Sequence, residues 1–363
     1  MATLTLRPDA ALLVKKPEVR THAAADLAGQ LPRLEGYVRG GGQVPLSRHP
    51  GWLPALQQSL SHPVYCLEAV EGGKTLGILP LAYVRSLLFG RFLISLPYLN
   101  YGGPVAESDA AAAALIDRAV ALADELDVRY LELRNERAYE HPALGHTSAA
   151  KTHMRLPLPG TAEELWRQLP AKVRNQVRKA EKGELAVAWG RQELLPEFYS
   201  VFAHNMRDLG TPVYGRRLFR AVLDAFPGRA EFCVVRAGRR AVAAGLVLHG
   251  WGVSEVPSAS SLRRYNCTNA NMLMYWHLLV RAVERRQEVF DFGRSGEDST
   301  TYRFKKQWGA TPSPAEWQYY LRKGGIKDMR PDNPRYGRLI AIWKRLPVAL
   351  TRWIGPHIVR GIP

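Results

Sequence analysis

The chain has 363 residues, 46% of them hydrophobic, which is enough to bury large cores and exceeds the length of one typical domain. Lys and Arg number 50 against 33 Asp and Glu, a formal net charge of +17. This composition excludes a mostly disordered chain, and the charge favours an anionic partner such as nucleic acid, an anionic lipid surface or a phosphorylated substrate. Solubility alone is the other explanation, because net charge names no partner.

Several widespread functional signals are missing. Cys66, Cys233 and Cys267 form no Cys-x-x-Cys pair, which predicts reduced thiols in a cytosolic protein. No His-Glu-x-x-His and no Gly-x-Ser-x-Gly occurs, so the signals of zinc and serine hydrolases fail, and we expect no metal site. Residues 1–19 do not resemble a secretory signal, and no uncharged apolar run reaches the roughly 18 residues of a spanning helix. We therefore expect a cytoplasmic protein.

Two segments of the chain follow one plan, in which a strand hairpin precedes an amphipathic helix and a last strand. These elements lie at 65–79, 110–126 and 128–134 in the first segment, and at 232–247, 271–285 and 288–294 in the second. The offset of roughly 160–170 residues is what two copies of one α/β unit would give. Two unrelated strand-helix-strand units would look similar, so chance similarity is the alternative.

The predicted fold class is α/β, because a hairpin, a helix and a following strand fit a mixed sheet with helices on its faces. The stretch Pro157-Leu158-Pro159-Gly160 is the natural joint between the two units. We therefore predict domains at 1–156 and 161–320, followed by a tail at 321–363.

A basic helix is predicted at 171–183, where Pro170 opens it and an apolar stripe lies on one face. Its basic side chains are Lys172, Arg174, Arg178, Lys179 and Lys182. Such a run is either a solvated face or an anion-binding helix that borders a cleft between the two halves.

The tail from Arg335 onward is also basic, with no acidic residue, and its cations are interleaved with Leu, Ile and Trp. This pattern suits an interfacial helix on an anionic membrane, which Pro347 would divide into two short pieces. The alternative is a tail that packs on the body of the protein.

The best candidate for an active site is at 289–309, where an apolar strand opens into a loop dense in charge. Ligands usually sit at the carboxyl end of a central strand in α/β sheets. The Asp291-Phe292-Gly293 triplet also occurs in kinases, but no glycine-rich loop and no His-Arg-Asp loop precede it.

At about 60–315 the chain resembles the FemAB family of aminoacyl- and acyltransferases. The segment 171–181 is similar to the family's basic helix, and Asp291-Phe292-Gly293 followed by Phe304-Lys305 and Gly309 is similar to its second motif. The resemblance implies two tandem GNAT-like domains, each a mixed, mostly antiparallel sheet flanked by helices. More narrowly, the chain is similar to the FemAB-like proteins of exosortase (PEP-CTERM) and exopolysaccharide systems in Gram-negative bacteria.

The resemblance implies transfer of an aminoacyl or acyl group onto an amine or hydroxyl of a peptidoglycan or exopolysaccharide precursor. The donor would be aminoacyl-tRNA or acyl-CoA, with no permanently bound cofactor, and the precursor could be lipid-linked. A location at the inner face of the cytoplasmic membrane, with the tail in peripheral contact, would suit such an acceptor. Two further functions stay open: a CoA-dependent acetyltransferase, and a non-catalytic nucleic-acid or membrane-binding adaptor.

Site residues follow from the same resemblance and from the needs of acyl transfer. Lys305 would meet donor phosphate, and Asp291 would be the general base or else a buried carboxylate that orients Arg294. Phe304 would stack on the donor or pack in the core. The expected donor-binding set is Lys172, Arg174, Asn175, Arg178, Arg294, Glu297, Tyr302 and Phe304. Arg294 and the three cations of the basic helix could instead pair with Glu297 or Asp298.

The turn at 263–271 bears on which donor is bound. It precedes the helix predicted at 271–285, and a GNAT enzyme holds the pyrophosphate of its donor at the corresponding turn. In this chain the turn contains no glycine. Without glycine the backbone cannot approach pyrophosphate closely, which argues against ordinary acetyl-CoA binding and toward the FemAB pattern.

Overall fold

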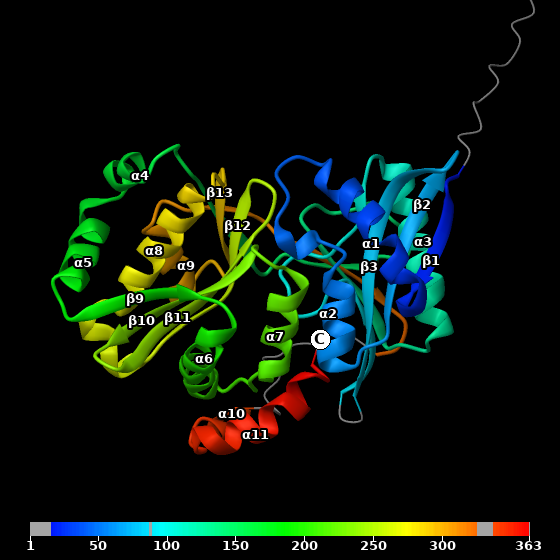
Figure 1. Ribbon diagram of the computed structural model, residues 1–363. Helices are drawn as coiled ribbons and strands as arrows, with labels where there is room; N and C mark the ends of the chain where they lie inside the picture. The colour runs from blue at the N-terminus through cyan, green and yellow to red at the C-terminus, as the bar shows by residue number, and fades with distance from the viewer. Residues whose placement is uncertain (1–15, 87–88, 325–336, 363) are drawn as a thin grey trace, which may run out of the picture.

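The computed structural model describes residues 16–86, 89–324 and 337–362, and it contains two mixed sheets flanked by helices (Figure 1). The first sheet has the order β1-β2-β3-β4-β6-β15-β7, with β5 on β3, and the second has the order β14-β8-β13-β12-β11-β10-β9. Within these described residues each sheet contains a single parallel pair, β4 with β6 and β12 with β13. The predicted fold class is therefore confirmed.

The strands of the first sheet are β1 (Glu18–Ala23), β2 (Val64–Glu71), β3 (Lys74–Ser86), β4 (Gly90–Ile94), β5 (Val105–Ala106), β6 (Tyr130–Asn135), β7 (His146–Ser148) and β15 (Glu316–Leu321). Those of the second are β8 (Thr152–Pro157), β9 (Leu185–Gly190), β10 (Ala230–Ala237), β11 (Arg240–His249), β12 (Val253–Ser261), β13 (Val289–Ser295) and β14 (Thr311–Pro314). The helices are α1 (Ala24–Arg39), α2 (Trp52–Leu60), α3 (Asp109–Glu125), α4 (Ala162–Gln168), α5 (Ala171–Glu181), α6 (Leu195–Leu209), α7 (Arg216–Ala225), α8 (Ala270–Glu284), α9 (Thr300–Lys306), α10 (Gly337–Trp343) and α11 (Val348–Val359).

The two halves repeat one topology. The hairpin β2-β3 corresponds to β10-β11, each is followed by a third antiparallel strand, and α3 or α8 then leads to the parallel strand. The hairpins, helices and last strands predicted from the duplicated pattern are confirmed, with ends shifted by one or two residues except in β3, which continues to Ser86.

Strands are exchanged between the halves. Thr152–Pro157 follows the first half in the chain but pairs with β13 of the second sheet, and Glu316–Leu321 follows the second half but pairs with β6 of the first. Together β7-β8 and β14-β15 make one antiparallel ribbon that crosses both sheets, from Thr311 opposite Arg155 to Tyr319 opposite His146. Sheet pairing thus crosses the predicted domain limits in both directions, and residues 1–15, 87–88, 325–336 and 363 of the predicted domains lie outside the described residues.

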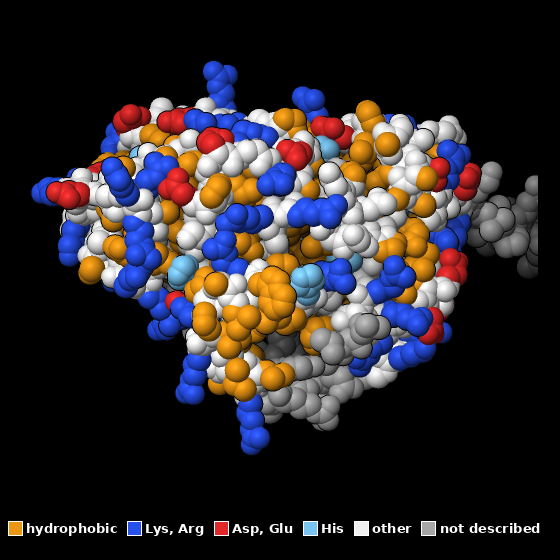
Figure 2. Space-filling model, turned by 60° about the horizontal axis from the view of Figure 1, so that its bottom comes forward, with side chains coloured by type: hydrophobic (Ala, Val, Ile, Leu, Met, Phe, Trp, Pro, Cys, Tyr) orange, Lys and Arg blue, Asp and Glu red, His pale blue; other side chains and the backbone are white. Residues whose placement is uncertain are grey.

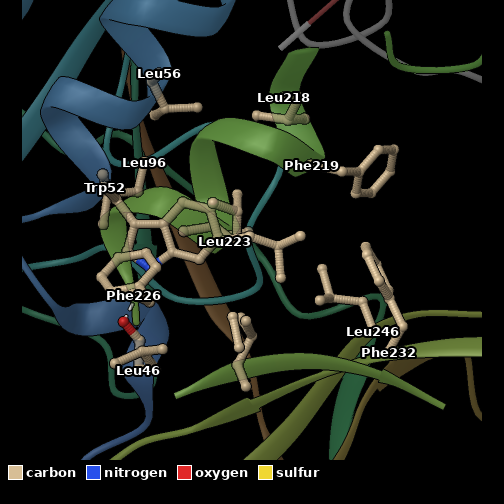
Figure 3. Close-up of a cluster of buried hydrophobic side chains, with 14 of the residues drawn as sticks. Leu46, Trp52, Leu56, Leu96, Leu218, Phe219, Leu223, Phe226, Phe232 and Leu246 are labelled. Atoms are coloured by element: carbon tan, nitrogen blue, oxygen red, sulfur yellow. Dashed lines mark hydrogen bonds between the residues drawn. The ribbon is translucent and has the colours of Figure 1, made fainter. Parts of the chain in front are cut away.

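A shared apolar core joins the halves. Trp52, Leu56 and Leu96 of the first half belong to one buried cluster with Leu223 and Phe226 of the second, where α2 packs on α7 (Figure 3). The rings of Trp52 and Phe226 lie 5.1 Å apart between centroids. Separate cores lie between the first sheet and α3 and between the second sheet and α5 and α8, so α1, α2, α6 and α7 form the layer between the sheets. Because this core contains buried apolar side chains from both halves, its burial holds the halves together.

A glycine pair closes the gap between β4 and β6 where these parallel strands diverge. The backbone N–H groups of Gly102 and Gly103 both donate to Arg134 O, at 3.2 and 3.1 Å. A Cβ at Gly102 would lie 2.1 Å from Ser95 O, and one at Gly103 would lie 2.0 Å from Asn135 Oδ1. Only glycine therefore lets residues 101–103 pass so close to the sheet.

The predicted tail forms the two helices α10 and α11, and Pro347 separates them. They lie beside α6 at the bottom of the molecule as Figure 1 shows it. Among the described residues no helix is long and apolar enough to cross a bilayer.

The close approach at Gly102 makes a stability prediction. Because its obstacle is a backbone oxygen that cannot rotate away, Gly102→Ala should lower the free energy of unfolding by about 3 kcal/mol. Gly36→Ala is the control, since Gly36 lies in α1 with no heavy atom within 4 Å of a Cβ, and it should be neutral or stabilise slightly. Urea unfolding of both variants measures the difference; equal effects would contradict the packing argument.

Candidate active site

The candidate site begins where β12 and β13 separate. Their parallel pairing runs from Val253 opposite Val289 to Glu255 opposite Asp291 and then stops. Beyond it Gly293 has φ +78°, and a Cβ there would lie 3.1 Å from Asn100 Nδ2 and 3.9 Å from Lys305 Nζ. The Asp-Phe-Gly triplet therefore lies where the second sheet, α9 and a loop of the first half meet, and its glycine makes that approach possible.

Asp291 is fully buried and has three hydrogen-bond donors. Its Oδ1 accepts from Gly293 N at 2.6 Å, and its Oδ2 accepts from Arg155 Nε at 3.1 Å and from the Tyr101 hydroxyl. Burial and then the Asp291 charge raise the pKa of Tyr101 well above its usual value, so the phenol stays protonated and donates. This geometry suits a carboxylate that positions Arg155 and Tyr101, and the general-base role of Asp291 stays a prediction.

A second carboxylate extends this network into the first half. Glu136 forms ion pairs with Arg48 and Arg155, and both guanidinium groups lie over the Tyr101 ring, at 5.9 and 5.1 Å from its centroid. Burial alone would raise the pKa of Glu136, but the two arginines hold it at about 2. Glu136, Arg48, Arg155, Tyr101 and Asp291 are here called the interdomain charge cluster, in which two guanidinium groups balance two carboxylates and the neutral phenol donates to one of them.

Glu255 of β12 lies opposite Asp291 of the neighbouring strand β13, and its carboxyl has a strongly raised pKa. Burial, followed by the charge of Asp291, raises its pKa to about 8, and its Oε1 accepts a hydrogen bond from Ser47 N at 2.5 Å. A carboxyl with this pKa is mostly protonated at neutral pH, which avoids two adjacent buried negative charges.

Lys305 points to the end of β13 from α9. Its Nζ donates to Gly293 O at 3.1 Å and to Arg294 O at 3.0 Å. Burial lowers its pKa to about 8; Asp291 opposes this shift and Lys151 adds to it. An ammonium has three N–H donors, so one remains for a ligand beside Gly293.

Arg294 follows on the same strand and stacks on Trp317 of β15, 3.3 Å from the ring centroid, while Arg134 lies 4.2 Å from that centroid. Burial and then the charge of Arg134 lower its pKa to about 10. No carboxylate pairs with Arg294 among the residues the structure describes, and its buried Nε has no hydrogen-bond partner there. Asp291 thus orients Arg155 rather than Arg294.

The predicted basic helix lies elsewhere. It forms α5, which packs on α8 at the outer side of the second half, away from β13 in Figure 1. Lys172, Asn175 and Arg178 are exposed, Arg174 is half-buried, and Arg178 lies 5.4 Å from the Trp166 ring centroid. The structure does not bring these four residues to the interdomain charge cluster, and their donor-binding role stays a prediction.

The remaining predicted site residues lie close to Lys305 in the chain. Glu297 is exposed at the start of the loop, and Tyr302 is half-buried in the first turn of α9, which Ser299 caps. Phe304 packs edge-on against Tyr275 at 4.9 Å between centroids, as a core side chain does. No ion pair of Glu297 or Asp298 with the predicted cations is present within the described ranges.

Sequence reasoning missed most of the interdomain charge cluster. Arg155 lies just before the stretch 157–160 interpreted as a joint, Arg48 ends a short 3-10 helix (Leu46–Arg48), and Tyr101 and Glu136 lie in loops, so none of the four belongs to a motif used for the site. Glu255 carried a usable signal, because an acidic residue inside a strand-like run is unusual. No group of three or more His, Cys, Asp or Glu side chains in the described parts could hold a metal ion.

The turn before α8 has no glycine-rich phosphate loop. Arg263–Thr268 forms a 3-10 helix with Arg263 and Arg264 exposed, and Asn269 adopts the left-handed conformation with φ 58°. The turn therefore exposes cationic side chains before α8, where a glycine loop would expose backbone N–H groups.

Comparison with known proteins identifies the second half. Residues 167–306 match the acetyltransferase (GNAT) domain family. The whole fold is similar to the crystal structure of FemX (TM-score 0.62, 15% identity, covering 85% of this chain and 98% of that one). It is also similar to a tandem GNAT protein of the clavulanic acid biosynthesis pathway (TM-score 0.53, 14% identity, covering 85% of this chain and 99% of that one). A third similar structure is L-PGS from Bacillus licheniformis (TM-score 0.52, 12% identity, covering 89% of this chain and 96% of that one). A search of curated proteins gives no match. The chain thus carries a GNAT domain within a fold of the tandem GNAT kind.

The hydroxyl of Tyr101 provides a test of the buried network. Tyr101→Phe leaves Asp291 short of one donor in a buried site and should lower the free energy of unfolding by about 2 kcal/mol. Tyr320→Phe is the matched control, because the Tyr320 hydroxyl also donates to an aspartate, Asp124, but at the surface; its effect should stay below about 0.5 kcal/mol. Chemical unfolding compares them, and equal losses would show that burial adds nothing to this bond.

Lys305 makes the stability of the protein depend on pH. Burial lowers its folded pKa from 10.5 to about 8, so the unfolded chain binds more protons between these values. Stability should therefore rise with pH in that window. The difference in unfolding free energy between wild type and Lys305→Met should increase by up to about 3 kcal/mol from pH 8 to pH 10.5. Urea unfolding at both pH values measures it; a constant difference would mean that Lys305 is not desolvated.

Proposed function

We propose that this protein is an acyltransferase of the FemAB type, which moves an aminoacyl or acyl group onto an amine or hydroxyl of a cell-envelope precursor. One observation carries the proposal. In the half that matches a GNAT domain, the two parallel strands separate beside Gly293 and Lys305, and a loop of the first half reaches that point through Asn100 and Tyr101. A site built by both halves can bring a donor and an acceptor together.

The reaction needs few groups. The acceptor nitrogen or oxygen attacks the carbonyl carbon of the donor and loses its proton, the carbonyl oxygen becomes an oxyanion, and the donor oxygen or sulfur leaves with a proton. The third N–H of Lys305 is available to an oxyanion or a phosphate oxygen, and Arg294 adds a positive charge that pairs with no carboxylate within the described residues. Asp291 binds both Arg155 and Tyr101, and Glu136 also binds Arg155, so the two carboxylates hold these side chains in place.

The donor is anionic in either version of the proposal. Exposed Arg263 and Arg264 beside a turn without glycine favour aminoacyl-tRNA, since these side chains can reach a nucleic-acid backbone where the main chain cannot approach pyrophosphate. The second candidate is a CoA-dependent N- or O-acetyltransferase, which the match of residues 167–306 to the GNAT domain favours. The basic helix α5 would extend the positive track for a long donor.

The acceptor and location follow from the resemblance to the FemAB family. Peptidoglycan or exopolysaccharide precursors, including the lipid-linked ones, are the proposed acceptors, and the exosortase-associated members are the proposed subgroup. Likeness of the fold to FemX supports this proposal. We place the protein in the cytoplasm at the inner face of the membrane, with the two tail helices α10 and α11 in contact with it.

Donor binding tests the proposal directly. Titration with charged tRNA, uncharged tRNA and acetyl-CoA at two salt concentrations should show tighter binding of charged tRNA and a steep loss of affinity with salt. Lys305→Gln should weaken binding at least about tenfold, because a desolvated charge-assisted contact is lost. Lys306→Gln is the matched control, because Lys306 is the next residue in the chain and its side chain is exposed. Saturable acetyl-CoA binding without preference for charged tRNA would replace the first candidate with the second.

A further inference from the structure

The two tail helices carry an exposed apolar face. The described residues include five large hydrophobic side chains that are exposed, and four of them lie on this tail: Leu339 (61%), Ile342 (57%), Leu350 (36%) and Trp353 (72%). Members of each pair are three residues apart and so share a helix face. Figure 2 shows an apolar patch with basic side chains around it on the face that contains the tail.

The opposite face of the tail is fixed to the body of the protein. A Cβ at Gly355 would lie 2.9 Å from Val213 N, and one at Gly210 would lie 2.5 Å from Ile340 Cγ2. Arg207 Nη1 donates to Leu346 O at 2.9 Å. Because these contacts fix one side of each helix to the body of the protein, the apolar residues on the other side are held outward.

The charge of the tail identifies what covers this face. From Arg335 to the end the sequence has no acidic residue. Its cations Arg338, Lys344, Arg345 and Arg360 are exposed, and none forms an ion pair in the part of the chain that is described. A protein partner with a mixed surface would leave these charges partly unpaired, whereas phospholipid phosphates match them while acyl chains take up Trp353 and the aliphatic side chains.

We propose that Leu339, Ile342, Leu350 and Trp353, together with the exposed cations Arg338, Lys344, Arg345 and Arg360, form a docking surface for a bilayer that contains anionic phospholipid. This inference deepens the location proposed above by naming the surface and the lipid charge that hold the protein there. The helices would lie in the interface with their apolar side chains at the boundary of the acyl chains.

The docked tail also contacts a loop of the site. The Tyr98 hydroxyl donates to Arg360 O at 3.0 Å, and Tyr98 lies three residues before Tyr101, which binds Asp291. The surface that holds the bilayer is thus linked to the loop that the first half contributes to the site, as an enzyme with a lipid-linked acceptor needs.

Vesicle flotation of the full chain tests the surface without any substrate, so its outcome is independent of the proposed reaction. Wild type should bind vesicles that contain phosphatidylglycerol and not vesicles of phosphatidylcholine alone. Ile342→Gln with Trp353→Gln should weaken partitioning at least about tenfold. Arg338→Gln with Arg345→Gln should weaken it about 30-fold, from the usual contribution of each basic residue near an anionic surface. The matched control Arg239→Gln with Arg240→Gln removes two exposed charges from the β10-β11 turn and should bind as wild type does.

Three results would overturn the proposal. The first is equal vesicle binding by wild type and both tail variants, and the second is equal binding of wild type to neutral and anionic vesicles. The third is that wild type does not bind vesicles but forms a concentration-dependent dimer, which the Ile342→Gln, Trp353→Gln variant does not form. The last would show that a second copy of the chain covers the face. All changed side chains are exposed, so thermal melting should be the same for the four proteins.

Discussion

The ribbon of β7-β8 and β14-β15 is the constraint on which the rest of the structure depends. In each half the last parallel strand needs another strand on its outer side, and the partner comes from the other half of the chain. Unpaired backbone groups are costly when buried, so neither sheet is complete without this exchange. The ribbon also brings Arg155 opposite Asp291, although 136 positions separate them in the chain.

The interdomain charge cluster is a consequence of that exchange and of the shared core. Once the halves are packed, several ionisable groups are buried at their border, where isolated charges are unfavourable. The arginines offset Glu136 and Asp291, and Glu255 avoids a further negative charge by its raised pKa. Such a cluster contributes little net stability compared with apolar packing, so its value lies in the fixed orientation of Tyr101 and Arg155.

The site near Lys305 and the membrane-docking surface of the tail depend on different physical features. The site near Lys305 depends on backbone geometry, since Gly293 and the carbonyls at the end of β13 hold the ammonium. The tail surface depends on composition, since its exposed side chains are either apolar or cationic. The loop that contains both Tyr98 and Tyr101 connects them through the body of the first half.

Sequence reasoning recovered the local elements and missed the contacts between distant ones. Strand hairpins and amphipathic helices are encoded over roughly 5 to 20 neighbouring residues, at about the periods of strand and helix. This is why the duplicated plan and the Asp-Phe-Gly segment could be found. The exchange of Thr152–Pro157 and Glu316–Leu321 could not, because the choice of sheet depends on which edge is unpaired in the folded chain.

By itself the sequence determined that this chain has two similar α/β units, an anion-favouring charge, a polar loop after β13 and a basic, apolar tail. Only the tertiary structure decided that Asp291 binds Arg155 and Tyr101, that α5 lies away from them, and that one side of the tail packs while the other stays exposed. The reason is physical: periodicity and charge are properties of neighbours in the chain, whereas the partner of a buried charge is set by long-range packing.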